Sequence, residues 1–218
     1  MKSKSFTPPH TRNPIDRFRW WMRDIRLKEK RKQLINTNFS IISNNCIGGM
    51  VTHDFLQPQL SPTVNLFILP DDYLRLLKDL NNNLQSDVVK VESGRSFPAG
   101  MVNGCKINFM HYKTFEEGKQ AWIKRAQRID YNNLLVVLVE RDGCTYDNLK
   151  EFDSLPFVNK IAIVHKPYPE IQCAVVVPGY ENTKDVGRIT DWCSLFGERE
   201  YDRIDWPSVL NNIKKMDV

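Results

Sequence analysis

The stretch NNLLVVLVE, residues 132–140, places six consecutive apolar residues between an asparagine pair and a glutamate. A strand with one face in water alternates apolar and polar residues, whereas an unbroken apolar run of this length is typical of a strand covered on both faces. The stretch therefore predicts a strand inside a sheet that carries helices on both sides.

Strand-like runs recur along the rest of the chain, and helix signals lie between them. Further strands are predicted at FSIIS (39–43), VNLFIL (64–69), SDVVKV (86–91), GCKINFM (104–110), KIAIVH (160–165) and QCAVVV (172–177). Helices are predicted to begin at Pro70, at the capping box of residues 114–117, at Thr145 and at Asp205. This alternation predicts a three-layer α/β domain with a largely parallel or mixed central sheet and helices on both faces.

Length and charge divide the chain into an arm and one domain. A chain of 218 residues with 41% hydrophobic residues is long enough for one substantial core. We expect a basic amphipathic arm over residues 1–36 and a single α/β domain over residues 37–218. The first 33 residues hold eleven Lys and Arg against three acids, and the remainder holds twenty against twenty-three. A slightly acidic body gives no support for nucleic acid binding.

Cysteine usage and hydropathy both favour the cytoplasm. The five cysteines are scattered and form no CxxC pair or metal-spaced cluster: Cys46, Cys105, Cys144, Cys173 and Cys193. This pattern predicts reduced thiols rather than a disulfide framework or a structural zinc site. The N-terminal segment lacks the apolar core of a signal peptide, and no stretch approaches the ~18 to 20 apolar residues of a membrane span.

The arm carries apolar residues on two helical arcs, with basic residues between them. One arc holds Ile15, Phe18, Trp21, Met22 and Ile25, and the other holds Trp20, Leu27 and Leu34. A basic amphipathic helix with tryptophans suits an anionic membrane surface, which predicts a protein peripheral at the inner membrane. The alternative is a helix that packs on the domain with its basic face in water.

Polar side chains follow four of the predicted strands. They are Asn44, Asn45 and Cys46; His111, Tyr112 and Lys113; Arg141, Asp142 and Cys144; and His165, Lys166 and Tyr168. The carboxyl ends of parallel strands face one crevice, where ligands of open α/β sheets usually bind. We therefore expect one cleft lined by Asn44, Asn45, His111, Arg141, Asp142 and His165, with Lys113 and Lys166 near its mouth to meet phosphate or carboxylate.

Each of these residue types has both a chemical and a structural interpretation. His111 and His165 suit proton transfer near neutral pH, with Asp142 as an orienting carboxylate, although a lone histidine is more often structural. The amides of Asn44 and Asn45 would supply donors to an oxyanion or a phosphate. Together these groups predict a ligand pocket with acid–base capacity.

The junction SNNCIGG (43–49) ends a predicted strand on amides, a thiol and glycines. Cys46 lies where backbone N–H groups and a helix dipole favour the thiolate, so it is a candidate nucleophile; the alternative is a ligand-contacting or structural thiol. Gly48 would let a ligand approach the main chain closely. His53 would lie at the end of the following short helix, where it contacts the ligand or makes a helix-end hydrogen bond.

Several familiar signatures are absent from the sequence. There is no GxGxxG, no GxxxxGK[ST], no GxSxG and no DxD-like metal pair at a strand end. These absences lower the expectation of a P-loop ATPase and of a glycosyltransferase that uses a DxD metal site. The sequence predicts no metal site and identifies no cofactor.

Several long motifs, in order along the chain after the arm, resemble one bacterial family. The motifs are SNNCIGG, LSPTVNLFILPDDYLRLL, FMHYKTFEEGKQAW, LLVVLVERDGC, FDSLPFVNKIAIVHKPYPE and VVVPGY. They are similar to the family catalogued as domain of unknown function 1919, whose members are often labelled exopolysaccharide or capsule biosynthesis proteins. The resemblance implies a cytoplasmic α/β protein of surface-polysaccharide assembly, and it transfers no catalytic residue.

Two function classes follow from the pocket and the resemblance. The first is a transferase that moves an acyl or glycosyl-type group onto a sugar intermediate, with an acyl-CoA or a nucleotide sugar as donor. The second is a non-catalytic sugar-binding or assembly module that its arm recruits to the inner membrane. Loss of turnover on replacement of His111 or His165 would distinguish the enzyme from the module.

Overall fold

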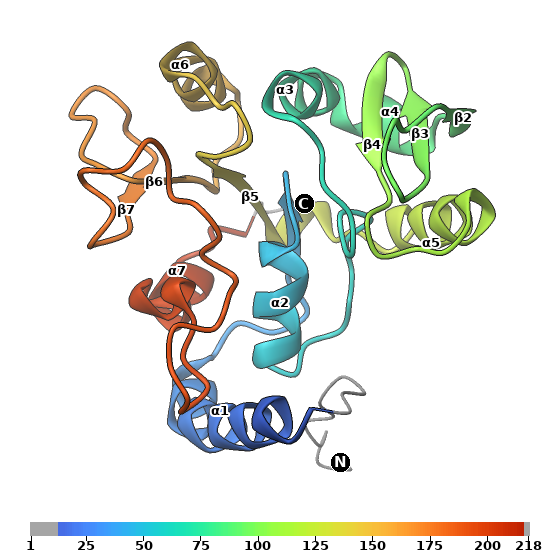
Figure 1. Ribbon diagram of the computed structural model, residues 1–218. Coiled ribbons are helices and arrows are strands. Elements are labelled where there is room, and N and C mark those ends of the chain that lie inside the picture. The colour runs from blue at the N-terminus through green and yellow to red at the C-terminus, as the bar shows by residue number, and fades with distance from the viewer. Residues whose placement is uncertain (1–12, 216–218) are drawn as a thin grey trace.

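The computed structural model describes residues 13–215 and is built around a parallel sheet of four strands (Figure 1). These strands are β1 (Ser40–Ser43), β5 (Leu134–Val139), β6 (Lys160–Val164) and β7 (Ala174–Val176), in the order β1-β5-β6-β7. All three pairings are parallel, so the carboxyl ends of the four strands lie at one edge of the sheet. That edge is where the sequence predicted a cleft.

The strand β5 confirms the expectation drawn from its unbroken apolar run. All six of its residues are buried. Val136 and Leu138 belong to the core on one face of the sheet, whereas Leu135, Val137 and Val139 belong to the core on the other. Because both faces are covered, every position of the strand is apolar, and the three-layer α/β fold is confirmed.

A second, smaller sheet is antiparallel and consists of β2 (Val89–Val91), β3 (Ala99–Val102) and β4 (Cys105–Asn108). The sequence analysis missed β3. A two-residue turn joins β3 to β4, and its residues Asn103 and Gly104 have φ of 45° and 79°. Asn-Gly is the preferred pair for such a hairpin turn, because both positions need positive φ.

The strand predicted at residues 64–69 is wrong. Within this segment only Phe67 forms a β-bridge, with Asn108 of β4, and Ile68 donates its N–H to the carbonyl of Asn44 at 2.8 Å. Leu66 and Ile68 are nonetheless buried in the core. The run is therefore apolar because its side chains are buried in the core, although its backbone forms no continuous ladder of strand hydrogen bonds.

Helices cover both faces of the parallel sheet. The helices of the described chain are α1 (Pro14–Gln33), α2 (Ile47–Asp54), α3 (Pro70–Lys78), α4 (Leu80–Gln85), α5 (Phe115–Ala126), α6 (Tyr146–Ser154) and α7 (Trp206–Asn211), with 3-10 turns η1 (Tyr131–Asn133) and η2 (Glu200–Arg203). The predicted N-caps are confirmed: Thr114 and Thr145 form capping boxes, and the Asp205 side chain accepts from the Ser208 N–H.

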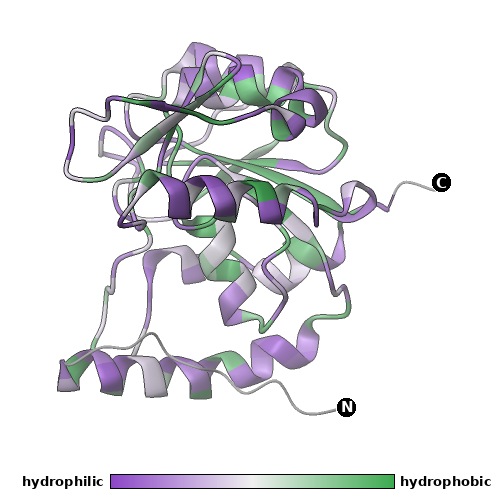
Figure 2. Cartoon of the chain, turned by 90° about the vertical axis from the view of Figure 1, so that its right-hand side faces the viewer, coloured by the Kyte–Doolittle hydropathy of each residue, from purple (hydrophilic) through white to green (hydrophobic). Residues whose placement is uncertain are grey.

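The arm forms α1, which lies along one side of the molecule beyond α2 and α7 (Figures 1 and 2). Residues 1–12 of the predicted arm lie outside the described residues. Asn13 caps the helix, with its side chain accepting from the Ile15 N–H, and Pro14 occupies the first turn. Within residues 13–215, no helix is long and apolar enough to span a membrane.

Candidate functional site

A cleft lies at the carboxyl edge of the parallel sheet and continues along α2 to α1. Two hollows of about 580 and 390 Å³ form it, and Cys46, Met50, His111 and Arg199 line both. The larger hollow, here called the arginine end, is lined also by Arg95, Arg141 and Arg188. The smaller hollow, here called the α1 end, is lined also by Trp20, Gly49, His53, Val64 and Arg125.

One face of α2 forms the wall that connects the two ends. Cys46 immediately precedes α2, Met50 lies one helical turn further, and His53 lies near its last residue. These positions are about one turn apart, so their side chains share one side of the helix. Because eight helical residues rise by about 12 Å, the cleft extends roughly that distance along α2 from the sheet edge toward Trp20.

The two asparagines after β1 have different roles. Asn44 is buried, donates its amide to the Val139 carbonyl at 3.1 Å and accepts from the Val139 N–H at 2.9 Å, so it joins β1 to β5 beneath the cleft. Asn45 lines the arginine end. Its Oδ1 accepts from the Ile47 N–H, but its buried Nδ2 has no hydrogen-bond partner among the described residues. Asn45 therefore offers a free donor to a ligand.

Cys46 lines both ends of the cleft, but its thiol is not activated. Burial raises the pKa of Cys46 to about 11, although a hydrogen bond to the Leu66 carbonyl and the charge of Arg141 oppose this shift. Desolvation therefore outweighs the helix terminus, and the direction of the pKa shift favours the alternative of a ligand-contacting or structural thiol over a nucleophile. At neutral pH Cys46 is a thiol that contacts the cleft.

His111 and the turn after β5 meet in the arginine end. His111 donates its backbone N–H to the Asn65 carbonyl at 3.3 Å. Arg141 and Asp142 form an ion pair of 2.8 Å within a turn whose Asp142 has φ of 56°. The structure therefore brings together Asn45, Cys46, His111, Arg141 and Asp142, which come from three separate predicted strand ends.

Three arginines of the cleft have no ion pair within the part of the chain that the structure describes. Arg95 lies over the rings of Phe67 and Phe97, and Arg125 donates to the Tyr112 hydroxyl at 2.5 Å. Arg199 is 8% exposed and stacks 3.6 Å from the centroid of the Trp192 ring. By contrast, the cleft arginines Arg141 and Arg188 pair with Asp142 and Asp191.

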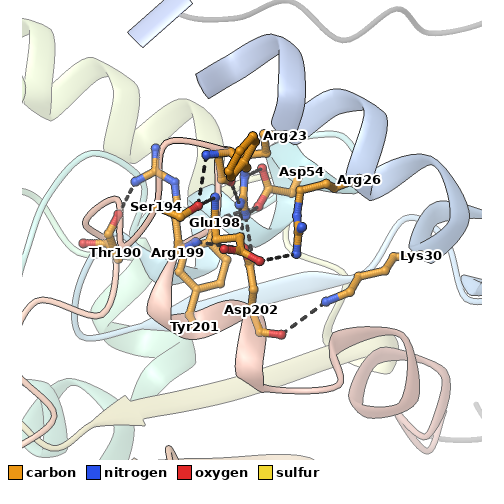
Figure 3. A network of polar contacts seen from close by, with 12 residues as sticks. Arg23, Arg26, Lys30, Asp54, Thr190, Ser194, Glu198, Arg199, Tyr201 and Asp202 are labelled. Carbon is orange, nitrogen blue, oxygen red and sulfur yellow. Dashed lines mark hydrogen bonds and ion pairs between the residues drawn. The ribbon is translucent and has the colours of Figure 1, made fainter. Parts of the chain in front are cut away.

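Arg199 is the most constrained of these cations. Its guanidinium lies over the Trp192 ring and beside Trp20, which packs edge-on against Trp192. One terminal nitrogen donates to the Thr190 carbonyl (Figure 3). Its buried Nε has no hydrogen-bond partner among residues 13–215. Burial lowers the pKa of Arg199 below its ordinary value, although nearby Tyr201 favours the charged form. A buried cation with a vacant donor at a cleft wall is suited to an anionic ligand.

The sequence analysis did not identify Arg95, Arg125, Arg188 or Arg199. Two of them follow glycines with positive φ: Gly94 at 68° and Gly187 at 55°. These Gly-Arg pairs in polar loops were the available signal. The predicted lysines lie elsewhere, since Lys113 and Lys166 do not line either end of the cleft.

His165 belongs to a separate cluster rather than to the cleft. Its Nδ1 lies 2.6 Å from Glu140 Oε2, its backbone N–H donates to the same oxygen, and Tyr168 donates its hydroxyl to Glu140 Oε1 at 2.7 Å. Burial and this bond to Glu140 raise the pKa of Tyr168. Glu140 therefore orients a histidine at the end of β6, but His165 does not line the hollows that contain His111.

The remaining predicted residues lie at or beside the cleft. His53 lines the α1 end and packs edge-on against Trp20, with ring centroids 5.7 Å apart. Tyr112 contacts the cleft residue Arg125 but does not line the hollows itself. Gly48 faces β1, because a Cβ there would lie 2.8 Å from Ser43 Oγ. Gly48 thus permits close packing of α2 on β1 rather than approach of a ligand.

This arrangement favours binding of a multiply charged anion. Arginine forks form bidentate hydrogen bonds with phosphate, and aromatic stacking holds the guanidinium of Arg199 in place. Phosphate-bearing cofactors and activated sugars therefore fit the donor set. Among the described residues there is no group of three or more His, Cys, Asp or Glu that could hold a metal ion.

Comparisons with known proteins cover nearly the whole described chain. A family model with the description "Domain of unknown function (DUF1919)" matches residues 19–211. A Haemophilus influenzae protein described as uncharacterized is 35% identical over 182 residues, which are 84% of this chain and 88% of that protein. The matched region includes the cleft and most of α1.

Proposed function

The chain belongs to the DUF1919 family, and from that premise we propose its function from the chemistry of the cleft. We propose that the cleft binds the phosphate groups of an activated donor. In this proposal the protein is a cytoplasmic transferase of bacterial surface-polysaccharide biosynthesis, and it acts on a sugar intermediate. Nucleotide sugars and acyl-CoA share a diphosphate, which is the group that the arginine end fits.

The observation that carries this proposal is that Arg95 and Arg199 at the arginine end pair with no carboxylate among the described residues. Like charges held together repel one another, and burial of Arg199 adds a desolvation cost. A diphosphate would offset both effects, since it supplies negative charge and several acceptor oxygens at one place. Arg199 Nε and Asn45 Nδ2, which have no hydrogen-bond partner among the described residues, add two donors to these cations. Binding of a neutral sugar alone would not require such a group of cations and donors.

The position of His111 supports a transfer reaction between the two ends of the cleft. With the donor phosphates at the arginine end and the acceptor sugar at the α1 end, His111 borders both. As a general base, His111 would take the proton from an acceptor hydroxyl as that oxygen bonds to the transferred carbon. For a sugar donor, the bond from the anomeric carbon to phosphate oxygen breaks, and the arginines stabilise the departing phosphate with its electron pair.

The second candidate is a non-catalytic module that binds the same anionic ligand. Three observations favour it. Cys46 is protonated at neutral pH, and the oriented pair His165 and Glu140 lies outside the cleft. In addition, no side-chain hydrogen bond orients the His111 imidazole within the described residues. A binding module would need the arginines but no oriented base.

The location proposed with this function is the cytoplasmic face of the inner membrane. The basic character of α1 supports it, since anionic lipids attract helices rich in Arg and Lys. A protein at that surface would meet sugar intermediates carried on membrane lipids.

Isothermal titration calorimetry tests the ligand proposal with uridine diphosphate sugars, acetyl-CoA and matching neutral sugars. We expect the diphosphates to bind and the neutral sugars to bind far more weakly. Arg95→Gln and Arg188→Gln should each weaken diphosphate binding by about tenfold, since a hydrogen bond to a charged group contributes ~1.5 to 3 kcal/mol. Both side chains are exposed, so the fold should persist.

Arg128→Gln is the matched control, because Arg128 is exposed and lies outside the cleft. Equal losses in Arg128→Gln and Arg95→Gln, or equal affinity for charged and neutral sugars, would contradict the proposal. His111→Ala then separates the two candidates. A transferase should retain diphosphate binding but lose product formation, whereas a module shows no turnover in either protein.

A further inference from the structure

The helix α1 is docked on the body and yet exposes its apolar arc. Ile15 is 51% exposed, Phe18 43%, Trp21 59% and Ile25 40%. At 100° per residue these four side chains lie on the side of α1 opposite to Arg23 and Leu27, which are buried against the body. Figure 2 shows hydrophobic positions along this outlying helix. The arc is about 15 Å long, from a rise of 1.5 Å per residue.

Arg23 holds α1 in this orientation. Its guanidinium is buried, with bonds to Asp54 at 2.5 and 3.0 Å and to Asp202 at 2.8 Å (Figure 3). It also donates to the Tyr201 hydroxyl at 2.8 Å and to the Gly197 carbonyl at 2.9 Å. A rotation that turned the apolar arc inward would break all of these contacts. The two interpretations of the arm are therefore compatible, since the helix packs on the domain and still presents its apolar arc to solvent.

A loop of residues 194–198 extends this exposed apolar surface. Leu195 is 58% exposed and Phe196 is 57% exposed. The loop is fixed to α1 beside them, because a Cβ on Gly197 would lie 2.2 Å from the Arg19 carbonyl and Glu198 forms an ion pair of 2.6 Å with Arg26. The helix and the loop are thus fixed to each other, and their exposed apolar side chains are here together called the α1 surface.

The charges of α1 indicate what covers this surface. Every acid of the helix is already paired with a cation of the same helix: Asp16 with Arg19, Asp24 with Arg31 and Glu29 with Lys32. Arg17 and Lys28 are exposed beside the apolar arc and have no ion pair within residues 13–215. A second copy packed arc to arc would bring these cations together without acids to pair them. An anionic lipid surface supplies the negative charge and an apolar layer together.

We infer that the α1 surface is a docking site for an anionic lipid bilayer, with Phe18, Trp21, Leu195 and Phe196 entering the headgroup layer. The inference rests on the location proposed above, and it adds the loop of residues 194–198 to the contact that α1 would make with the bilayer. Because α1 also forms the end wall of the cleft through Trp20, docking would hold the α1 end of the cleft toward the membrane.

Co-sedimentation of the full chain with vesicles tests this inference. One set of vesicles contains phosphatidylglycerol in phosphatidylcholine, and the other contains phosphatidylcholine alone. We expect binding to the anionic vesicles that weakens as salt is raised. The double variants Phe18→Ser/Trp21→Ser and Leu195→Ser/Phe196→Ser should each lower vesicle partition by about tenfold or more, since large apolar side chains would no longer be buried.

Val158→Ser is the matched control, because Val158 is 62% exposed and precedes β6, away from α1. Equal recovery with both kinds of vesicle, or partition of the two double variants equal to that of Val158→Ser, overturns the inference. So does a dimer in sedimentation velocity that Phe18→Ser/Trp21→Ser dissociates without any vesicle binding. Diphosphate binding measured in solution on the same variants should stay unchanged, so failure of the cleft proposal and failure of membrane docking give different results.

Discussion

At the scale of single residues, the cleft works through groups whose charge at neutral pH is fixed by their surroundings. Arg199 stays a cation against the rings of Trp192 and Trp20, and Asn45 presents an amide donor without a partner in the described chain. Cys46, which lines the same hollow, remains a thiol because burial disfavours its charged form. The cleft therefore offers donors and cations to a ligand but no ready sulfur nucleophile.

The raised pKa of Cys46 predicts slow alkylation. Only the thiolate reacts with iodoacetamide, so a pKa of about 11 leaves very little reactive form at pH 8. We expect the labelling rate of Cys46, followed by mass spectrometry, to keep rising up to pH 10 and to stay below that of the exposed Cys193. Cys46→Ala should retain diphosphate binding. Rapid labelling of Cys46 below pH 8 would restore the nucleophile hypothesis.

The cleft was predictable only where its residues follow strands. Asn45 and Arg141 could be assigned because the parallel strands β1 and β5 end at one edge of the sheet. His111 follows β4 of the antiparallel sheet, and its bond to the Asn65 carbonyl brings it to the cleft instead. Arg95 and Arg199 come from loops without periodicity, and their positions depend on stacking against Phe67, Trp20 and Trp192, which only the folded chain brings near. His165 follows a strand too, but Glu140 holds it apart from the cleft.

At the scale of elements, local pattern predicted the parallel strands and the helix caps. Burial on both faces makes β5 apolar at every position, and Thr114 and Thr145 cap their helices through nearby residues. The strand β3 was missed because Gly100 interrupts its pattern. A Cβ at Gly100 would lie 2.5 Å from the Val88 side chain, so packing across the sheet requires a residue that weakens the strand signal.

The packing of α2 on β1 gives a prediction at this scale. Gly48→Ala should lower the free energy of unfolding by ~1 to 3 kcal/mol, because its Cβ would lie 2.8 Å from Ser43 Oγ and 2.9 Å from Ile41 Cγ2. This loss should appear although alanine favours a helix over glycine by about 1 kcal/mol. Urea denaturation measures the change.

Gly49→Ala is the comparison, since it lies in the same helical turn and its Cβ would meet Val64 Cγ1 at 3.2 Å. We expect a smaller loss there, because the Val64 side chain can shift. A Gly48→Ala variant as stable as Gly49→Ala would show that α2 does not depend on close contact with β1.

At the scale of the whole molecule, a single guanidinium joins segments that lie far apart in sequence. Arg23 of α1 bonds to Asp54 at the end of α2 and to Asp202 in η2, at separations of 31 and 179 residues. Nothing in the local pattern of the arm predicts this contact, because the partners of Arg23 are set by the complete fold. The sequence therefore predicted the helix α1 but not the contacts of Arg23 that hold it on the body.

Removal of Arg23 should destabilise the protein and change its response to acid. Arg23→Gln leaves buried carboxylates without their cation, which costs ~3 to 5 kcal/mol. Burial opposes ionisation of Asp202, but the hydrogen bond and charge of Arg23 lower its pKa below the ordinary 3.8. A lowered pKa stabilises the fold above pH 3.8, and this contribution is lost as the pH falls through the folded-state pKa.

Chemical denaturation from pH 7 to pH 3 checks both expectations. The unfolding free energy of the wild type should fall as the pH drops below about 3.8, whereas Arg23→Gln should start lower and show a shallower fall. Arg17→Gln is the control, since Arg17 is exposed and should stay within about 0.5 kcal/mol of the wild type. Parallel acid profiles for the wild type and Arg23→Gln would show that Asp202 gains nothing from Arg23.

The separation of Arg23 and Asp202 along the sequence also determines when α1 can dock on the body during synthesis. The residue that completes its ion pairs follows it by 179 positions, which at about 5 to 20 residues per second is a delay of roughly 10 to 35 seconds. Throughout this interval α1 is without its final partner. Both apolar arcs of α1 would then be open to solvent, the one that later faces the body and the one that stays exposed. During this interval the helix could contact chaperones or the membrane through either arc.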